Sequence, residues 1–360
     1  MYVTTGLMIP PVDDLARRLD DLLSGALAAG LGSAAAVSVG DAGAERVAVV
    51  RGTAWTGGPA IAAATRFDVA SLTKPMATAA LAMVLVGDGR LDLDAPIRRY
   101  VPAAASTGTV AQLLGHAAGC AAHVEFWKRP GALDRASLVA QAAGEPAGPS
   151  GVAAVYSDLG YIVLGAVIER ACGQPLEEAY RDLVAGPLGL DARFAGTTAL
   201  PDCVATERDA RGLVSGRVHD ENAYYGGGVC GHAGLFAAIG DVARFAEAMV
   251  GLASGDAHGR IRPDVAARFW TTAGAPDTSW RLGWDTPSRT PGVSHAGDRW
   301  PRTGALGHLG FTGTSLWLDL PRRRWVALLT NRVHPTREGS ADATKALRRA
   351  VGDAVVDALG

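Results

Sequence analysis

The pattern of hydrophobic and polar positions divides the chain into two ends that predict strands and a middle that predicts helices. Residues 12 to 29 place five leucines on one helical face, opposite a face of aspartates and arginines. This spacing predicts a surface helix lying on a core. The valine-containing runs Ala34–Val39 and Arg46–Arg51 flank Gly40-Asp41-Ala42-Gly43 and predict a β-hairpin.

The other end of the chain repeats this arrangement. Thr314–Leu320 and Trp325–Thr330 are short apolar runs separated by Pro321-Arg322-Arg323, and a helical stretch covers residues 341 to 359. Both ends therefore predict strands plus one helix.

Between them, from about residue 72 to 295, the chain reads as helices joined by loops rich in glycine and proline. The predicted helices are Leu72–Val86, Val110–Leu114, Tyr156–Arg170, Leu176–Leu183, Asp241–Met249 and Pro263–Thr271.

These elements predict an α/β (α+β) fold with an antiparallel sheet, flanked by the N- and C-terminal helices, and an inserted all-helical lobe. We expect residues 1–70 and 296–360 to form one discontinuous α/β lobe and residues 71–295 a mostly helical lobe. Together they would form a single catalytic unit with its site at the seam, since pockets favour such interfaces.

Composition excludes several function classes. The 360 residues carry 34 Lys plus Arg against 36 Asp plus Glu, a net charge of −2, so nucleic acid is not an expected partner. The longest apolar stretch, from residue 77 to 86, is about half the roughly 20 residues that span a bilayer, so no membrane crossing is expected. Asp13 and Asp14 precede Arg17, and no basic segment of a secretory signal is visible, which indicates a cytoplasmic protein.

Metal and disulfide chemistry find no support in the sequence. The four cysteines are widely spaced without a C-x-x-C pair, which favours reduced, mostly buried thiols. The eight histidines include no H-E-x-x-H, which argues against a zinc peptidase. We expect no metal or other cofactor.

The sharpest candidate for chemistry is the segment from Phe67 to Pro75, where a short extended run enters an apolar helix. Pro75 is best tolerated in a first helical turn, so the helix should begin close to Ser71, and Ser71 and Lys74 should then share a face. A lysine at a desolvated seam can have a pKa low enough to take the proton of a serine hydroxyl. Only three of the 34 cations are lysines, and an arginine could not exchange that proton. A surface serine and lysine in a first helical turn is the alternative.

Two further segments carry polar groups of interest. Tyr156 opens an apolar helix and has a phenol able to move a proton, although an ordinary half-buried tyrosine is the alternative. His308 lies in a glycine-rich entry into a strand, where small residues allow a ligand to approach backbone N–H groups. A structural histidine is the alternative there.

The order Ser71-x-x-Lys74, Tyr156-x-Asp158 and His308-x-Gly310 resembles the three-motif signature of the serine β-lactamase and penicillin-binding protein superfamily. More narrowly, it is similar to the class C β-lactamase-like branch, which also holds D,D-peptidases, D-aminopeptidases and esterases. The resemblance covers nearly the whole chain, through further blocks in family order: Thr65–Ser71, Gly89–Asp94, Gln112–His116, Pro187–Leu190, Gly231–Phe236 and Gly307–Gly313.

The resemblance implies roles for these residues. Ser71 would be the nucleophile that forms the acyl-enzyme, Lys74 its partner, and Tyr156 the group that takes and returns the proton, as a phenolate favoured by the lysine charge. The backbone N–H groups of Ser71 and Phe311 would form the oxyanion hole. His308 would hydrogen-bond a substrate carboxylate or the tyrosine.

The sequence departs from the family pattern at two places. Asp158 stands where asparagine is common, so an amide donor to the substrate is missing and a carboxylate could repel an acidic group. The loop around His116 also departs from the common pattern, which leaves its role open. His232 either lines the pocket or is a loop histidine packed on the helical lobe.

The sequence therefore predicts a serine hydrolase that acts through an acyl-enzyme on a small ester, amide or lactam, with an ester preferred because no export signal is visible. The alternatives are a class C-type β-lactamase, a D,D-peptidase or D-aminopeptidase, and a catalytically silent scaffold of the same fold. A small-molecule substrate is the expected partner, and the oligomeric state is not predicted.

Overall fold

The computed structural model describes residues 12–360. The α-helices are α1 (Val12–Ala28), α2 (Ala80–Gly87), α3 (Val110–Leu114), α4 (Arg135–Gly144), α5 (Asp158–Cys172), α6 (Leu176–Tyr180), α7 (Gly186–Leu188), α8 (Glu221–Tyr225), α9 (Ile239–Ala253), α10 (Pro263–Thr271) and α11 (Ala341–Leu359). Tighter and wider helical turns are η1 (Ala70–Leu72), η2 (Lys74–Ala79), η3 (Ile97–Arg99), η4 (Phe126–Lys128) and η5 (Arg181–Ala185). The strands are β1 (Ala34–Asp41), β2 (Ala44–Gly52), β3 (Phe67–Asp68), β4 (Arg193–Phe194), β5 (Ala205–Asp209), β6 (Gly212–Ser215), β7 (Leu235–Ala237), β8 (Ala305–Leu309), β9 (Ser315–Asp319) and β10 (Arg324–Thr330).

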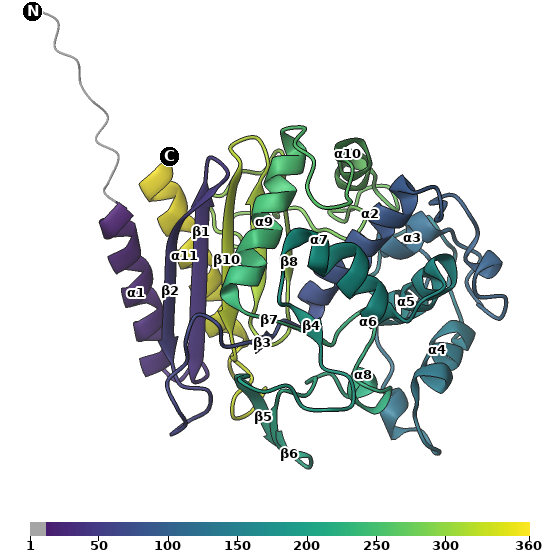
Figure 1. The fold of residues 1–360 in the computed structure, drawn as a ribbon, viewed down its shortest axis with the longest axis horizontal. Helices are drawn as coiled ribbons and strands as arrows, with labels where there is room; N and C mark the ends of the chain where they lie inside the picture. Colours follow the sequence, from purple (N-terminus) through teal and green to yellow (C-terminus); the bar gives the residue numbers. More distant parts are fainter. Residues whose placement is uncertain (1–11) are drawn as a thin grey trace, which may run out of the picture.

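The two chain ends meet in a five-stranded antiparallel sheet of order β2-β1-β10-β9-β8. Strand β1 pairs with β10, with Val37 opposite Leu328, so segments almost 300 residues apart lie side by side at its centre (Figure 1). Hairpin turns join β1 to β2 and β9 to β10, as the sequence predicts.

Helices cover both faces of this sheet. Helices α1 and α11 pack against one face (Figure 1), where Leu15, Leu19 and Leu23 of α1 belong to one buried cluster with residues of the sheet. Helix α9 packs against the other face, on β1 and β10. The predicted fold class is confirmed: an antiparallel sheet flanked by the terminal helices, with a mainly helical region beside it.

The middle of the chain differs from the all-helical lobe that the sequence predicts. It contains strands β4 to β7. Strands β4 and β7 join β3 in the three-stranded sheet β3-β7-β4, and β5 and β6 form a hairpin. These strands have two to five residues, too few for an alternating pattern to be visible in the sequence. Helix α9 also belongs to the layers around the large sheet. The division at residues 70/71 and 295/296 stays a prediction, and its residues 1–11 lie outside the described part of the chain.

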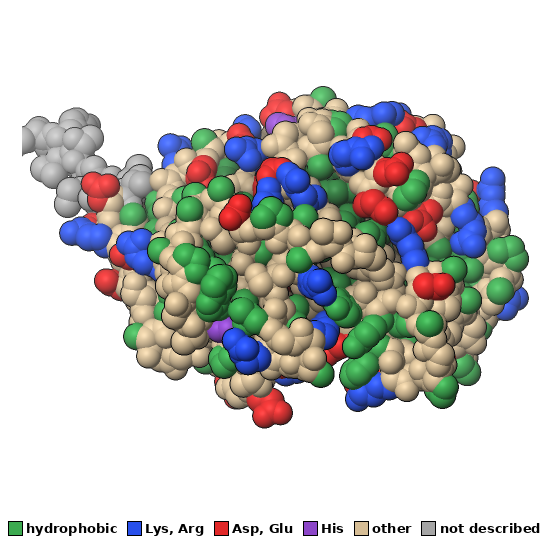
Figure 2. Space-filling model, turned by 60° about the horizontal axis from the view of Figure 1, so that its bottom comes forward, with side chains coloured by type: hydrophobic (Ala, Val, Ile, Leu, Met, Phe, Trp, Pro, Cys, Tyr) green, Lys and Arg blue, Asp and Glu red, His purple; other side chains and the backbone are tan. Residues whose placement is uncertain are grey.

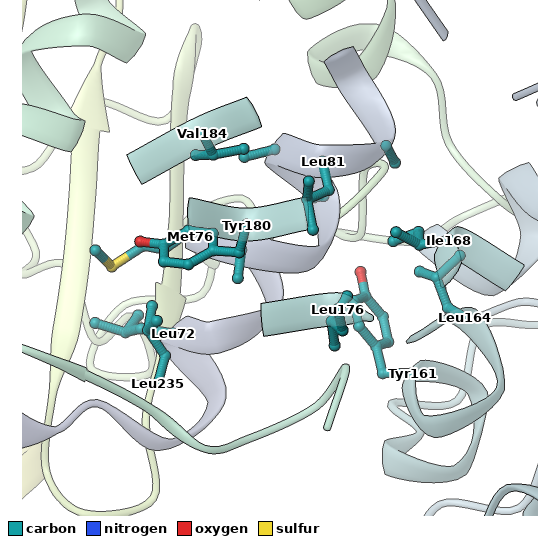
Figure 3. Close-up of a cluster of buried hydrophobic side chains, with 14 of the residues drawn as sticks. Leu72, Met76, Leu81, Tyr161, Leu164, Ile168, Leu176, Tyr180, Val184 and Leu235 are labelled. Carbon is teal, nitrogen blue, oxygen red and sulfur yellow. The ribbon is translucent and has the colours of Figure 1, made fainter. Parts of the chain in front are cut away.

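The helical stretch Ala70–Gly87 passes through the main core. By length and composition alone it could span a membrane, with a mean hydropathy of 1.4 over 18 residues, but 78% of that window is buried inside the fold. Figure 3 shows Met76 from this stretch beside Tyr180, and Leu72 beside Leu235 of β7, within the same buried cluster. The core therefore encloses Lys74 and most of this stretch, whereas Ser71, near its start, is partly exposed.

Candidate active site

The backbone before Ser71 forms a tight turn rather than a regular helix start. Asp68, at the end of β3, accepts hydrogen bonds from the N–H of Ala70 (2.8 Å) and the N–H of His219 (2.7 Å). Ala70 has a φ of 49°, in the left-handed region that costs energy for residues with a Cβ. Asp68 therefore fixes the turn that presents Ser71, ahead of the wide helical turn of η2.

Lys74 lies three residues after Ser71 on the same side of the helical stretch. Its buried ammonium donates to Ser71 Oγ (3.0 Å), to Asp158 Oδ1 (2.8 Å) and to the carbonyl oxygen of His232 (3.2 Å). Burial by itself would lower the pKa of Lys74, but the charge of Asp158 and the nearby Tyr156 outweigh it and raise the pKa above its ordinary value. Lys74 is protonated at rest, so the prediction of a lowered lysine pKa is wrong.

Asp158 is the anionic partner of Lys74. One carboxylate oxygen accepts from Lys74, and the other lies 3.4 Å from Nδ1 of His123, a half-exposed histidine at the pocket mouth. Burial would raise the pKa of Asp158, yet the Lys74 charge and His123 hold it well below its usual range. Its negative charge is therefore balanced by Lys74, which weakens the expected repulsion of acidic groups.

Tyr156 lies just before helix α5, which begins at Asp158, two residues later than the sequence predicts. Ser157 is the N-cap of α5, its Oγ accepting from the N–H of Gly160 (2.9 Å), which leaves Tyr156 in the preceding loop. Lys74 Nζ lies 4.8 Å from the centre of the tyrosine ring. Burial raises the pKa of Tyr156. The negative charge of Asp158 raises it further, while the positive charge of Lys74 opposes both effects. The phenol is therefore protonated at rest, which corrects the phenolate that the family resemblance implies.

His308, on β8, stands across the cavity from Tyr156 with 6.0 Å between the two ring centres. Its Nδ1 lies 2.8 Å from the carbonyl oxygen of Leu309, and because a carbonyl only accepts, Nδ1 carries the proton. Burial and the Lys74 charge lower the pKa of His308 to about 3. His308 is therefore a neutral ring with Nε2 as an acceptor. Of the two predicted partners, this suits the tyrosine hydroxyl and not a carboxylate.

The turn that carries Phe311 is tied to the segment before the nucleophile. Gly310 N–H donates to the carbonyl oxygen of Thr314 (2.7 Å), closing the turn. The hydroxyls of Thr312 and Thr314 donate to the carbonyl oxygens of Asp68 (2.8 Å) and Val69 (2.9 Å). The turn that carries Phe311 is thereby tied to the two residues that precede the Ala70-Ser71 segment, and the oxyanion hole stays a prediction.

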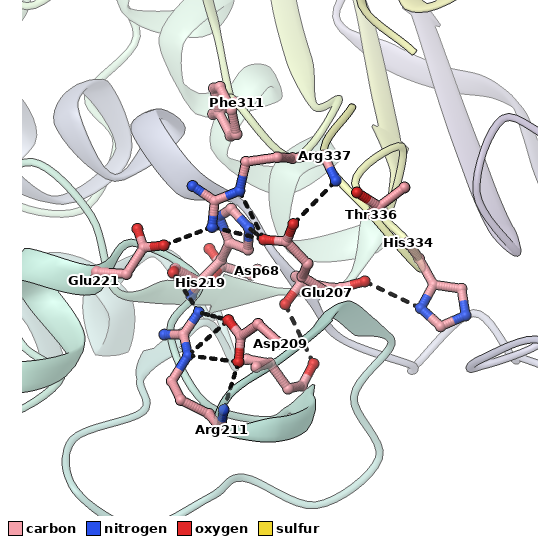
Figure 4. A network of polar contacts seen from close by, with 12 residues as sticks. Asp68, Glu207, Asp209, Arg211, His219, Glu221, Phe311, His334, Thr336 and Arg337 are labelled. Carbon is pink, nitrogen blue, oxygen red and sulfur yellow. Dashed lines mark hydrogen bonds and ion pairs between the residues drawn. The ribbon is translucent and has the colours of Figure 1, made fainter. Parts of the chain in front are cut away.

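The Phe311 side chain, 50% exposed, lies between two polar groups at the cavity. The ring of His219 stacks on one side, with 5.7 Å between centres, and the guanidinium of Arg332 lies 4.5 Å from the ring centre. His219 is held in turn by Glu207 (2.9 Å), which also binds Arg337, as Figure 4 shows. This network fixes the wall of the cavity next to the oxyanion turn.

These residues line a cavity of about 620 Å³ that contains Ser71, Tyr156, Asp158, His232, His308, Gly310 and Phe311. His232 is buried, and its ring pairs with Asp220 (2.9 Å). Burial would lower the pKa of His232, but Asp220 raises it well above the ordinary value, so the ring is charged. On the face of the protein in Figure 2, acidic and basic side chains are interspersed.

Several cavity residues were not among the sequence predictions. They are Asp68, His123, His219, Asp220, Trp280, Arg332, Arg337 and Arg348. Apart from Asp68, which lies in the Thr65–Ser71 block, none stands in a motif that the sequence analysis names. They reach the cavity from strand β3, from separate loops and from α11. Cys120 and Cys230, two of the free cysteines, do not line this cavity. Burial raises the pKa of the Cys120 thiol to about 11.

Comparison with known proteins places the chain in a family. The model of the β-lactamase family matches residues 19–350. A relative from Escherichia coli K12, named provisionally as a D-alanyl-D-alanine carboxypeptidase, is 29% identical over 309 residues, covering 75% of this chain and 70% of that protein.

Solved structures share the fold. EstCE1, described as a hydrolase with promiscuous acyltransferase activity, superposes with a TM-score of 0.73 at 22% identity, covering 96% of this chain and 99% of that one. A class C β-lactamase from Rhodobacter sphaeroides superposes with a TM-score of 0.72 at 16% identity, covering 96% and 100%. At these identities the two structures support the fold alone.

Proposed function

This chain belongs to the β-lactamase family of serine hydrolases, and we propose that it hydrolyses small esters or amides whose leaving group carries a carboxylate. The reaction would run through an acyl-enzyme on Ser71. The observation that carries the substrate class is a pair of buried arginines, Arg332 and Arg348, beside the oxyanion turn.

Both arginines lack an acidic partner. Each is 8% exposed, and within residues 12–360 neither forms an ion pair with a carboxylate. Arg348 donates to the carbonyl oxygens of Gly310 (2.9 Å) and Thr314 (2.6 Å), and Arg332 donates to that of Phe311 (2.6 Å). Burial and the neighbouring Arg332 lower the pKa of Arg348 to about 9. Because unpaired buried charges are costly, an anionic group of the substrate suits this end of the cavity.

The geometry supports a two-stage reaction. Tyr156, once ionised, takes the proton of Ser71 as Oγ attacks the carbonyl carbon, and the N–H groups of Ser71 and Phe311 bind the developing oxyanion. The leaving group departs with the proton from Tyr156. A water molecule then gives its proton to Tyr156 and attacks the acyl-enzyme, and Ser71 recovers that proton as it leaves. Throughout, the Lys74 charge stabilises the phenolate.

Two matched esters test this proposal. A 3-carboxyphenyl ester and the corresponding 3-carbamoylphenyl ester differ mainly in charge, and we expect kcat/KM to favour the carboxylate by roughly tenfold or more, the range of a charge-assisted contact. Arg332→Gln should bring the two esters within about threefold of each other. Arg211→Gln is the control, because that arginine is paired with Asp209 and does not line the cavity. Equal turnover of both esters by the unmodified protein would contradict the substrate class.

The name of the Escherichia coli relative also supports a carboxylate-bearing substrate, since the leaving group of a D-alanyl-D-alanine carboxypeptidase is an amino acid. The preference for an ester over an amide stays a prediction. Turnover of N-acyl-D-Ala-D-Ala together with loss of turnover for its C-terminal amide would favour the peptidase.

A β-lactamase is the second candidate, favoured by the same two arginines because penicillins carry a carboxylate beside the lactam. Rapid hydrolysis of nitrocefin would favour it, whereas a long-lived penicillin adduct would favour a peptidase. An absence of adducts with every ester, amide and lactam would indicate a silent scaffold.

A further inference from the structure

The loop around His116 lies directly against the loop that carries Tyr156. The carbonyl oxygen of His116 accepts from the N–H of Val155 (2.9 Å), and its Nδ1 accepts from the N–H of Ser157 (3.1 Å). One residue therefore binds the backbone on both sides of Tyr156.

The imidazole of His116 also packs on the tyrosine ring. The two ring centres are 4.7 Å apart, and the His116 ring contacts Tyr161 (4.9 Å) and Trp280 (4.6 Å) as well. Trp280 contacts Tyr156 from its own side at 5.2 Å. The phenol is thus fixed by its flanking backbone and by two neighbouring rings.

Two properties of His116 have a cost in stability: its backbone conformation and an unpaired ring nitrogen. Its φ is 58°, in the left-handed region that costs energy for residues other than glycine, although histidine, like asparagine and aspartate, adopts it more often than most. It is buried, and its Nε2, which carries the proton because Nδ1 accepts, has no hydrogen-bond partner among the described residues. Strained and unpaired groups of this kind concentrate at functional sites, where the geometry is needed.

We propose that His116 is a positioning residue that holds the Tyr156 hydroxyl in line with Ser71. Its neutral ring accepts from the backbone after Tyr156 and packs on the phenol, while its carbonyl group holds the backbone before it. This inference rests on the proposed function, because it assumes that Tyr156 moves the proton of Ser71.

Two variants separate the backbone from the side chain. Glycine adopts a φ of 58° without strain, so His116→Gly keeps the turn but removes the ring and the acceptor. Asparagine also tolerates this conformation, and its Oδ1 lies at the same distance along the side chain as histidine Nδ1, so His116→Asn keeps the acceptor. His334→Asn changes a buried histidine that does not line the cavity and serves as the control.

The readout is the rate constant of Ser71 acylation at saturating 3-carboxyphenyl ester, measured on protein that melts cooperatively. We expect His116→Gly to lower it about 30- to 100-fold with KM within about threefold, the loss typical of a misplaced reacting group. His116→Asn should stay within about fivefold of the unmodified protein, and the control within about twofold. A folded His116→Gly protein that acylates within threefold of the unmodified rate would overturn the inference.

A double variant shows whether His116 acts through Tyr156. In the Tyr156→Phe background, His116→Gly should lower acylation by less than about threefold, because the group it positions is already gone. If His116→Gly lowers the acylation rate constant by the same roughly 30- to 100-fold in the Tyr156→Phe background, His116 has a general structural role and the proposal is contradicted. If Tyr156→Phe alone leaves acylation unchanged, the proposed function fails instead, so the two failures are distinguishable.

Discussion

Replacing Asp158 by asparagine tests how the site controls the ionisation of Tyr156. The Lys74 ammonium lies 4.8 Å from the centre of the tyrosine ring, and with an effective dielectric constant of about 20 its full charge would stabilise the phenolate by about 3.5 kcal/mol. That energy corresponds to about 2.5 units of tyrosine pKa. At present Asp158, only 2.8 Å from the same ammonium, cancels part of this field and raises the tyrosine pKa.

Tyr156 also raises the pKa of Lys74, so the ammonium keeps its proton beside a phenolate when Asp158 is removed. We therefore expect Asp158→Asn to lower the pKa of Tyr156. Because the phenolate is the active form, kcat/KM for the unmodified protein should rise with pH through the alkaline range. In Asp158→Asn the same rise of kcat/KM should occur about one to two pH units lower. Each pH unit by which the profile moves should raise kcat/KM at neutral pH roughly tenfold. The assay is kcat/KM for a 3-carboxyphenyl ester between about pH 5 and pH 10.

Glu125→Gln is the matched control, because Glu125 lines the same cavity but binds Lys128 rather than Lys74. A pH profile that is unchanged in Asp158→Asn, or displaced to higher pH, would refute the electrostatic reasoning. Loss of activity at every pH in a folded Asp158→Asn protein would also refute the electrostatic reasoning. It would indicate that Asp158, rather than Tyr156, accepts the proton of Ser71.

Three further predictions concern catalysis, packing and pH. Lys74→Arg should lower acylation at least about 10³-fold, because the fully buried ammonium leaves no room for a guanidinium; stopped-flow acylation checks this, and near-normal rates would contradict it. Met76→Ala should lower the free energy of unfolding by about 2–5 kcal/mol in urea titrations, since Met76 is fully buried; a change below 1 kcal/mol would contradict it. Burial would raise the pKa of Glu207, but hydrogen bonds from His219 and Arg337 hold it well below 4.5 in the folded protein. The ionised Glu207 therefore stabilises the fold above about pH 4.5, and this contribution is lost as the pH falls toward the lowered pKa. Glu207→Gln should therefore reduce the loss of stability below about pH 4.5, and an identical pH dependence of the melting temperature would contradict this.

The parts of the site that the sequence predicts are those joined by local spacing. Ser71 and Lys74 are three residues apart on one helical stretch, and their atoms meet at 3.0 Å. The two hairpins and the terminal helices were predictable for the same reason, because their periodicity is local. Tyr156 and His308 were visible as candidates in their own segments, but their roles came from the family resemblance, and the structure brings both to the cavity.

Long-range packing explains what the sequence could not predict. The sequence argument considered the burial of Lys74 without its partner 84 residues away, and so gave the wrong direction for its pKa. His116 was visible only as an odd loop residue, since its contacts with the backbone around Tyr156 depend on how two distant loops pack. Arg332 and Arg348 come from a loop and a C-terminal helix with no motif, and only the folded chain places them at one cavity.

The most direct test of the account is intact-mass spectrometry of the protein after brief incubation with a 3-carboxyphenyl ester, with Ser71→Ala as the comparison. The account predicts a transient mass increase equal to the acyl group, located on the peptide that contains Ser71, and none in Ser71→Ala. An unmodified mass during turnover, with ester hydrolysis by Ser71→Ala at the rate of the unmodified protein, would contradict it.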